Sequence, residues 1–329
     1  MHLLILGGTN FVGRHLVERA IADGHGVTLF NRGRTNPGIF KGIEEVHGDR
    51  DGGLDGLNGR TFDRVVDVSG YVPRIVRQSA ELLQEATDHY TFISSVSVYA
   101  DFTTTGIDEA SPVATTPDVA VEDITRDTYG PLKALCEDVV RSVYSERCTI
   151  VRPGIVAGPF DDTDRFTYWC MRASRSGEFV APDDAARPVQ FIDARDLAAF
   201  TLMTSEDSLH GVFNATGPLK EALGWGDFLA RCADVGGSDA LAVWVPERVL
   251  GEAGVDLGRE LPLYAPLDKP GFATVDCERA IAAGLEFSPL ERSIEDTLTW
   301  AREDDHELTA GMTKAREEEI LEALRRSRL

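Results

Sequence analysis

Apolar and polar residues alternate in short blocks along the first half of the chain. The run Leu3–Leu6 contains four apolar residues, which is typical of a strand buried on both faces of a parallel sheet. Small residues follow this run, and apolar residues then recur at helical spacing from Phe11 onward. Repetition of the pattern predicts further strands at 26–30, 44–47, 64–68, 90–94 and 149–152, and helices at 11–23, 74–85 and 129–144. Strands that alternate with helices in this way predict a Rossmann-type α/β fold, a doubly wound parallel sheet with helices on both faces.

The pattern is looser past residue 153, where loops rich in Pro and Asp separate the apolar segments. It predicts a strand near 188–192 and helices at about 165–176, 225–234, 276–283, 289–302 and 313–326. We therefore expect two parts. The α/β domain covers 1–153 and is rejoined by about 188–217, while about 154–187 and 218–329 form a smaller C-terminal substrate-binding lobe over the carboxyl ends of the strands.

Composition narrows the classes of protein that the chain can belong to. With 329 residues, of which 43% are hydrophobic, the chain can bury a large core, and no apolar stretch approaches the length of a membrane span. The N-terminal apolar run leads directly into glycines and does not resemble a signal peptide, so we expect a cytoplasmic protein. Five scattered cysteines without a Cys-x-x-Cys pair fit free thiols in a reducing compartment. The seven histidines show no metal-site spacing, so no metal is expected.

The formal net charge of −22 argues against nucleic acid or an anionic membrane as the main partner. A small-molecule substrate is therefore the expected partner. A negative net charge still permits a local basic pocket that binds an anionic ligand.

The segment between the first strand and the first helix has the features of a phosphate-binding loop. Gly7, Asn10 and Gly13 are spaced like a dinucleotide fingerprint, with asparagine at the middle glycine position. Asparagine tolerates a left-handed backbone, so the turn can still form. The helix N-terminus behind the loop offers free N–H groups and partial positive charge to a pyrophosphate. The expected cofactor contacts in this segment are Gly7, Thr9, Asn10, Phe11, Val12 and Gly13.

A tyrosine and a lysine four residues apart, Tyr129 and Lys133, are expected on one face of a helix. An ammonium close to a phenol favours the phenolate, so it lowers the pKa of the phenol toward the range useful for proton transfer. A serine of the Ser94–Ser95 pair could hold a substrate oxygen against that phenol. The spacing alone is also that of an ordinary amphipathic helix, and the glycine loop is what favours the catalytic interpretation.

Several ordered motifs connect these features. They are Gly7–Gly13, Ile93–Tyr99, Asp108–Pro112, Tyr129–Glu137, Arg152–Pro159, Gln190–Ala198 and Phe213–Gly217. In this order they resemble the motifs of the extended short-chain dehydrogenase/reductases, the NAD(P)-dependent epimerase/dehydratase family, over nearly the whole chain. The resemblance implies a cofactor-dependent enzyme, and the family often forms dimers through the tyrosine-bearing helix, so a homodimer is the expected assembly.

The resemblance also implies roles for individual residues. Tyr129 would act as general acid or base, and Lys133 would lower its pKa and hold the nicotinamide ribose. Alignment on Val98–Tyr99 puts Ser95 in the position of the catalytic serine, where it would orient the substrate oxygen. Ser94 is a weaker candidate for this role.

The cofactor type is expected to depend on the end of the second strand. An acidic residue there would bind the adenosine ribose and repel a 2′-phosphate, but the chain has Asn31 followed by Arg32 and Arg34. Guanidinium groups suit a phosphate, so NADP is expected in preference to NAD, although both arginines could simply belong to a solvated loop. The remaining expected cofactor contacts are Asp49, Arg50, Val68, Ser69, Gly70, Pro153 and Ile155.

Two positions depart from the pattern of relatives that act on nucleotide sugars. Ile155 stands where those enzymes usually have an asparagine, and Val189 stands where they often have a phosphate-binding arginine. Arg187, on the same strand face by alternation, is the candidate replacement. The segment 160–169 mixes acids with aromatics, either as a substrate loop or as a helix start with its aromatics in the core. The candidate substrate contacts are Tyr71, Ser97, Arg165, Arg187 and Gln190.

Two classes of function remain open at this point. The first is an NAD(P)-dependent oxidoreductase that acts on a carbonyl or secondary alcohol, with nucleotide-sugar epimerisation or dehydration as the nearest variant. The second is a non-catalytic NAD(P)-binding or regulatory protein, because chloroplast stem-loop RNA-binding proteins use the same scaffold. Ser95, Tyr129 and Lys133 together favour the enzyme, and the negative charge argues against RNA.

Overall fold

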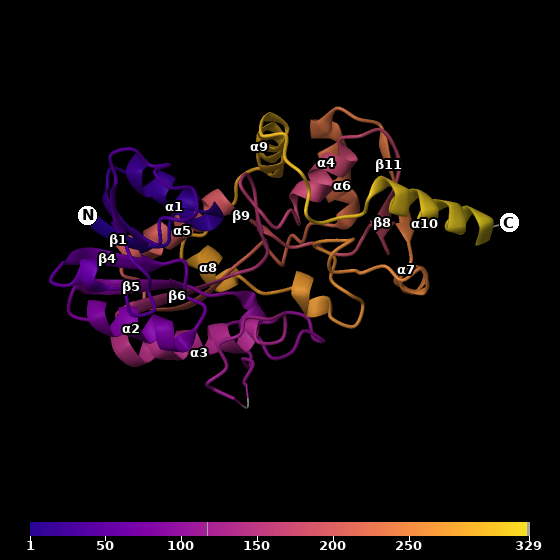
Figure 1. The fold of residues 1–329 in the computed structure, drawn as a ribbon. Coiled ribbons are helices and arrows are strands. Elements are labelled where there is room, and N and C mark those ends of the chain that lie inside the picture. Colours follow the sequence, from indigo (N-terminus) through magenta and orange to yellow (C-terminus); the bar gives the residue numbers. More distant parts are fainter. Residues whose placement is uncertain (117, 328–329) are drawn as a thin grey trace.

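A seven-stranded parallel sheet forms the centre of the larger part of the molecule in the computed structural model, which describes residues 1–116 and 118–327 (Figure 1). The strand order is β10-β6-β5-β4-β1-β2-β3. These strands are β1 (His2–Leu6), β2 (Gly26–Asn31), β3 (Glu44–His47), β4 (Phe62–Asp67), β5 (Thr87–Ile93), β6 (Cys148–Pro153) and β10 (Gly211–Ala215). The predicted α/β Rossmann-type fold is therefore confirmed.

Helices cover both faces of this sheet. Helices α1 (Phe11–Ala22) and α5 (Ala194–Glu206) lie on one face, and α2 (Pro73–Leu83) and α3 (Tyr129–Tyr144) lie on the other (Figure 1). Alternate residues of β1 pack against opposite layers: Leu3 and Ile5 contact the α1 side, whereas Leu4 and Leu6 contact the α2 and α3 side. Because both faces are buried, β1 needs the continuous apolar run that its sequence shows.

The C-terminal lobe has its own core and a small parallel sheet of two strands. Its elements are α4 (Thr167–Ala173), β8 (Gly177–Pro182), α6 (Trp225–Gly236), β11 (Ala240–Val245), α7 (Glu247–Glu252), α9 (Leu290–Glu303) and α10 (Lys314–Ser327). Phe166, Trp169, Trp225 and Phe228 are buried at its centre. Phe166 and Trp169 thus lie in the core. No helix in the described part of the chain is long and apolar enough to cross a membrane.

Short elements connect the two parts. They are β7 (Val156–Ala157), which pairs with β9 (Ile192–Asp193), the helix α8 (Glu278–Ala282) and the 3-10 turn η3 (Pro270–Ala273). Two further 3-10 turns, η1 (Asp55–Leu57) and η2 (Val96–Val98), lie within the α/β domain.

The strand predicted near 188–192 is largely wrong. Pro188 makes only an isolated bridge with Gly224, and regular pairing begins at Ile192. Pro188 has no N–H to donate, and Gln190 bonds through its side chain to the carbonyls of Gly217 and Val275. The strands β8 and β11 were not predicted, because short apolar runs do not distinguish strands from buried helices by periodicity.

Candidate functional site

The predicted site residues come from loops at the carboxyl ends of β1, β4 and β5 and from the start of α3. In open α/β sheets, ligands bind outside the carboxyl ends of the strands. The sheet order places β1, β4 and β5 side by side, so their carboxyl-terminal loops share one edge.

The glycine loop has a backbone shape that side chains would prevent. Gly7 and Gly8 have φ values of +106° and +99°, which L-residues rarely adopt. A Cβ on Gly13 would lie 2.8 Å from the Gly8 Cα, so α1 can approach the loop only with glycine at this position. Val68 packs against the loop, since its Cγ2 would lie 2.8 Å from a Cβ on Gly7. Gly8 was not among the predicted residues, although the sequence shows the Gly-Gly pair.

This loop fits the pyrophosphate of a dinucleotide. Asn10 precedes the first residue of α1, and its side chain does not cap the helix. The first-turn N–H groups of α1 therefore keep their capacity to bind an anion. Thr9 is buried, and its carbonyl accepts a hydrogen bond of 2.9 Å from Asn36 Nδ2. Phe11 and Val12 begin α1 and are partly buried.

The end of β2 presents two unpaired arginines. Asn31 Oδ1 accepts a hydrogen bond of 2.7 Å from the Gly33 N–H, so its side chain holds the turn. Asn31 Nδ2 also lies 3.4 Å from Glu45 Oε2. Arg32 and Arg34 are exposed and have no ion-pair partner within residues 1–116 and 118–327. The Asn36 contact with Thr9 folds this segment against the glycine loop.

Arg50 lies in a buried ion pair below the end of β4. Its two Nη atoms each lie 2.7 Å from an oxygen of Asp67, which is fully buried. Nη2 also donates to Ser79 Oγ at 2.6 Å, and Tyr90 Oη donates to Asp67 at 2.9 Å. Asp67 was not predicted, and this network fixes the backbone that leads into the 68–70 turn.

The remaining residues around this turn are also engaged locally. Ser69 Oγ donates to the Leu6 carbonyl at 3.0 Å, so it joins β4 to β1. The exposed Asp49 accepts a hydrogen bond from the Asp51 N–H at 3.1 Å. Gly70 leaves no room for a Cβ, which would lie 2.5 Å from Phe92 Cε2.

Tyr129 begins α3 and lies against the turn η2. A Cβ on Gly130 would lie 2.1 Å from the Ser97 carbonyl oxygen, so glycine lets α3 start directly on this turn. Ser95 Oγ accepts a hydrogen bond of 3.1 Å from the Ser97 N–H. Burial raises the pKa of Tyr129 above its ordinary value, although a hydrogen bond with Ser95 and the charge of Arg165 act in the opposite direction. The lowered pKa expected from the lysine spacing is therefore wrong for the protein alone, because burial outweighs the nearby charge. The structure thus brings Ser95, Ser97 and Tyr129 together.

Lys133 lies one turn further along α3 and is buried. Its Nζ donates to the Gly70 carbonyl at 2.8 Å and to the Ile93 carbonyl at 2.6 Å. Burial lowers the pKa of Lys133 to about 8. An ammonium has three donors, so one N–H remains for a ligand beside these two bonds. Nζ also lies 5.1 Å from the centre of the Tyr71 ring, and that ring lies 6.4 Å from the ring of Tyr129.

A buried polar network lies behind the serine strand. Glu137 accepts from Ser94 Oγ at 2.6 Å and from Arg152 Nε and Nη2 at 2.8 and 2.7 Å. Arg152 donates to Tyr99 Oη at 3.1 Å, and Tyr99 donates to Asn214 Oδ1 at 2.6 Å. Ser94 is therefore engaged by Glu137. The network crosses β5, β6 and β10.

The other substrate candidates are mostly occupied by contacts within the chain. Arg187 donates to Asp183 at 3.1 Å, to Tyr264 Oη at 2.9 Å and to the Ala265 carbonyl at 2.7 Å. Gln190 uses its amide group on the carbonyls of Gly217 and Val275.

Arg165 is partly buried and donates through Nε to Thr163 Oγ1 at 3.0 Å. Pro153 is buried at the end of β6, and Ile155 packs against the core of the lobe.

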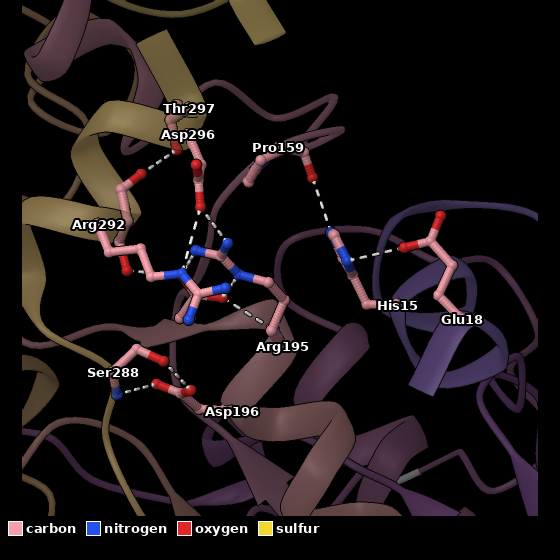
Figure 2. Close-up of polar contacts among 11 residues, drawn as sticks. His15, Glu18, Pro159, Arg195, Asp196, Ser288, Arg292, Asp296 and Thr297 are labelled. Carbon is pink, nitrogen blue, oxygen red and sulfur yellow. Dashed lines mark hydrogen bonds and ion pairs between the residues drawn. The ribbon is translucent and has the colours of Figure 1, made fainter. Parts of the chain in front are cut away.

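A separate cleft of about 570 Å³ lies between α1, the start of α5 and α9. Arg195 bonds there to both Asp193 and Asp296. His15 Nε2 lies 3.0 Å from the Pro159 carbonyl (Figure 2). Its lining does not include Ser95, Tyr129 or Lys133. Within the described residues, no group of three or more His, Cys, Asp or Glu side chains is arranged to hold a metal ion.

Comparison with known proteins finds a similarity to one family. The model of the NAD dependent epimerase/dehydratase family matches residues 69–215, a segment that contains Ser95, Tyr129 and Lys133. Over this segment the chain is similar to this family, the extended short-chain dehydrogenase/reductases.

Solved structures support the same fold. The UDP-glucuronic acid 4-epimerase from Bacillus cereus in complex with NAD has a TM-score of 0.65 and 17% identity, with 93% of this chain and 100% of that chain covered. The UDP-Glc/GlcNAc 4-epimerase from Campylobacter jejuni has a TM-score of 0.70 and 16% identity, covering 92% and 99%. A human epimerase family protein with NADPH has a TM-score of 0.60 and 18% identity, covering 91% and 99%. Structural relatives thus bind NAD or NADPH.

One relative with a similar sequence is named for binding and not for catalysis. The chloroplast stem-loop binding protein of 41 kDa b from Arabidopsis thaliana is 26% identical over 254 residues. The match covers 71% of this chain and 63% of that protein, less than two thirds of its length.

Proposed function

We propose that the protein is an NADP-dependent oxidoreductase that acts on a carbonyl or secondary alcohol of a small substrate. The observation that carries this proposal is the grouping of Ser95, Tyr129 and Lys133 at the sheet edge that also holds the glycine loop. The similarity of residues 69–215 to the NAD dependent epimerase/dehydratase family supports the same chemistry.

Tyr129 is the proton donor or acceptor in this proposal. Its phenol would give a proton to a carbonyl oxygen, or take one from a hydroxyl, while the Ser95 hydroxyl holds the same oxygen. A bound nicotinamide would supply or accept the hydride. Lys133 is held by the Gly70 and Ile93 carbonyls, so its remaining N–H can bind a ribose hydroxyl without loss of its orientation.

The unpaired arginines at the end of β2 support NADP over NAD. Arg32 and Arg34 are free to bind a 2′-phosphate, and Asn31 carries no charge that would repel it. Glu45 is the nearby acid, but Asn31 Nδ2 and His47 Nε2 both contact its Oε2.

Epimerisation of a nucleotide sugar has weaker support. Ile155 offers no hydrogen bond to a diphosphate and is packed against the lobe core. Arg187, the candidate replacement for a phosphate-binding arginine, is held by Asp183, Tyr264 and Ala265. A reductase or dehydrogenase therefore fits the site better.

A second candidate is a stem-loop RNA-binding protein, which the name of the Arabidopsis relative favours. The test is equilibrium titration of the protein with NADPH, with NADH and with a short synthetic RNA hairpin, all at the same salt concentration. We expect NADPH to bind most tightly and the hairpin to bind weakly, given the net charge of −22. Tight hairpin binding without binding of either dinucleotide would overturn the enzyme proposal.

A further inference from the structure

The segment 160–165, which we call the acidic loop, has left-handed backbone at two positions, one of them a bulky phenylalanine. Phe160 has φ +70° and Asp164 has φ +56°. Bulky side chains rarely adopt this region, and such strain concentrates where function requires a particular geometry. The acidic loop follows β7 and leads into α4.

All three aspartates of the acidic loop have partners other than Arg165. Asp161 Oδ1 accepts from the Thr163 N–H at 2.9 Å and from Thr163 Oγ1 at 2.6 Å, although its buried Oδ2 has no partner among the described residues. Asp162 accepts from Asn10 Nδ2 at 3.3 Å. Asp164 is held at the far end of the loop, where His306 Nε2 lies 2.6 Å from Oδ1 and the Thr309 N–H donates to Oδ2 at 2.7 Å.

Arg165 forms no salt bridge with a described residue, although its charge acts on the nearby Asp161 carboxylate. Its Nε donates to Thr163 Oγ1 at 3.0 Å, and neither Nη atom has a hydrogen bond to a described residue. Over residues 1–116 and 118–327, every other arginine without an acidic partner is exposed, whereas Arg165 is partly buried. A partly buried charge without a salt bridge is unfavourable. An anion that binds Arg165 would compensate this charge.

The contacts of the acidic loop place it beside the glycine loop. The Asn10–Asp162 contact joins the loop to the glycine loop. The charge of Asp162 acts on the Tyr71 phenol, whose ring is 6.4 Å from that of Tyr129, and the charge of Arg165 acts on Tyr129 itself. The acidic loop therefore borders the glycine loop, and the charge of Arg165 reaches the phenol of Tyr129.

Thr163 fixes the direction of the guanidinium. Its hydroxyl donates to Asp161 Oδ1 and accepts from Arg165 Nε, so the buried carboxylate, the hydroxyl and the guanidinium form one chain of hydrogen bonds. The two Nη groups are then presented as a preoriented fork, which matches the geometry of a carboxylate or phosphate.

We propose that Arg165, held by Asp161 and Thr163, binds an anionic group of the substrate, a carboxylate or a phosphate, beside Tyr129. The inference rests on the proposed oxidoreductase function and specifies its substrate class. It assigns the anion to Arg165 and not to Arg187, whose donors are already engaged by the lobe.

The test uses two matched pairs of probes with the NADP⁺-saturated protein. Acetoacetate is compared with methyl acetoacetate, and dihydroxyacetone phosphate with dihydroxyacetone, by isothermal titration calorimetry. We expect the anionic member of at least one pair to bind about tenfold or more tightly than its neutral partner, since charge-assisted hydrogen bonds contribute this much. The pair that shows the preference identifies carboxylate or phosphate as the group.

Variants test whether Arg165 causes the preference for the anionic probe. Arg165→Gln should abolish it, Thr163→Val should weaken it, and Arg302→Gln, the same charge change at an exposed position, should leave it intact. NADPH affinity measured on each variant shows that the protein remains folded.

Two results would overturn the inference: equal binding of charged and neutral probes by the wild type, or a preference that survives in Arg165→Gln. If NADPH binds while the preference is absent, only the anion site fails. If neither NADPH nor NADH binds the wild type, the proposed function fails with it.

Discussion

The buried pair of Glu137 and Arg152 should stabilise the part of the sheet that carries Ser95. Both side chains are almost fully buried, and two hydrogen bonds of 2.8 and 2.7 Å join them. In Glu137→Leu, Arg152 would keep its charge in the core and lose its acceptor. Breaking a buried pair in this way costs about 3–5 kcal/mol. We therefore expect Glu137→Leu to lower the free energy of unfolding by about that amount.

The reverse variant should be milder. In Arg152→Met, Glu137 keeps Arg141 Nη2 at 2.7 Å and Ser94 Oγ at 2.6 Å, so its charge remains compensated. The double variant removes both charges and replaces them with apolar groups. It should be more stable than the sum of the single effects implies, with a coupling energy of about 2–3 kcal/mol.

Urea unfolding followed by circular dichroism measures these differences. Arg248→Met is the matched control, because the Arg248–Glu252 pair is exposed and such pairs contribute about 0–1 kcal/mol. Single effects that add within about 0.5 kcal/mol in the double variant would show that the two groups are not coupled. The reasoning would then be refuted, and the network would not stabilise the serine strand.

Two further predictions concern the charges of the site. The pKa of Lys133 is about 8 in the folded protein and about 10.4 in the unfolded chain. Between these two pH values the unfolded state binds more protons than the folded state, so the free energy of unfolding should rise with pH. Between pH 8 and about 9.5 the stability of wild type should rise more steeply than that of Lys133→Met, by up to about 1.4 kcal/mol per pH unit, and parallel curves would contradict this. Replacing Arg32 and Arg34 together by Ala should weaken NADPH binding about tenfold or more and leave NADH binding unchanged, as measured by fluorescence titration. An equal loss of affinity for both cofactors would show that the two arginines do not bind the 2′-phosphate.

The sequence predicted those parts of the fold that depend on local pattern. The apolar run Leu3–Leu6 and the glycines behind it give the first strand and the loop, because burial on two faces and positive φ leave few alternatives. The strands β8 and β11 escaped prediction, since their apolar runs are short and their pairing partners lie more than sixty residues apart.

The chemistry of the site depends on contacts that no local pattern reveals. Asn10 and Asp162 are 152 residues apart, and their contact is what brings the acidic loop to the glycine loop. The spacing of Tyr129 and Lys133 predicted a shared helix face, but not that Lys133 would bond to the carbonyls of Gly70 and Ile93. Similarly, the position of Arg50 suggested a cofactor contact, whereas its guanidinium is paired with Asp67. Its proposed contact with the cofactor stays a prediction.

The most direct test of the central claim is to compare wild type with Tyr129→Phe. NADPH affinity is measured by fluorescence, and NADPH consumption is followed over a panel of aldehydes and ketones. We predict that the variant binds NADPH within about threefold of wild type and loses about 10²–10⁴-fold in turnover, the usual contribution of a positioned general acid. Turnover that survives in Tyr129→Phe would contradict the account, because the proton would then come from another group.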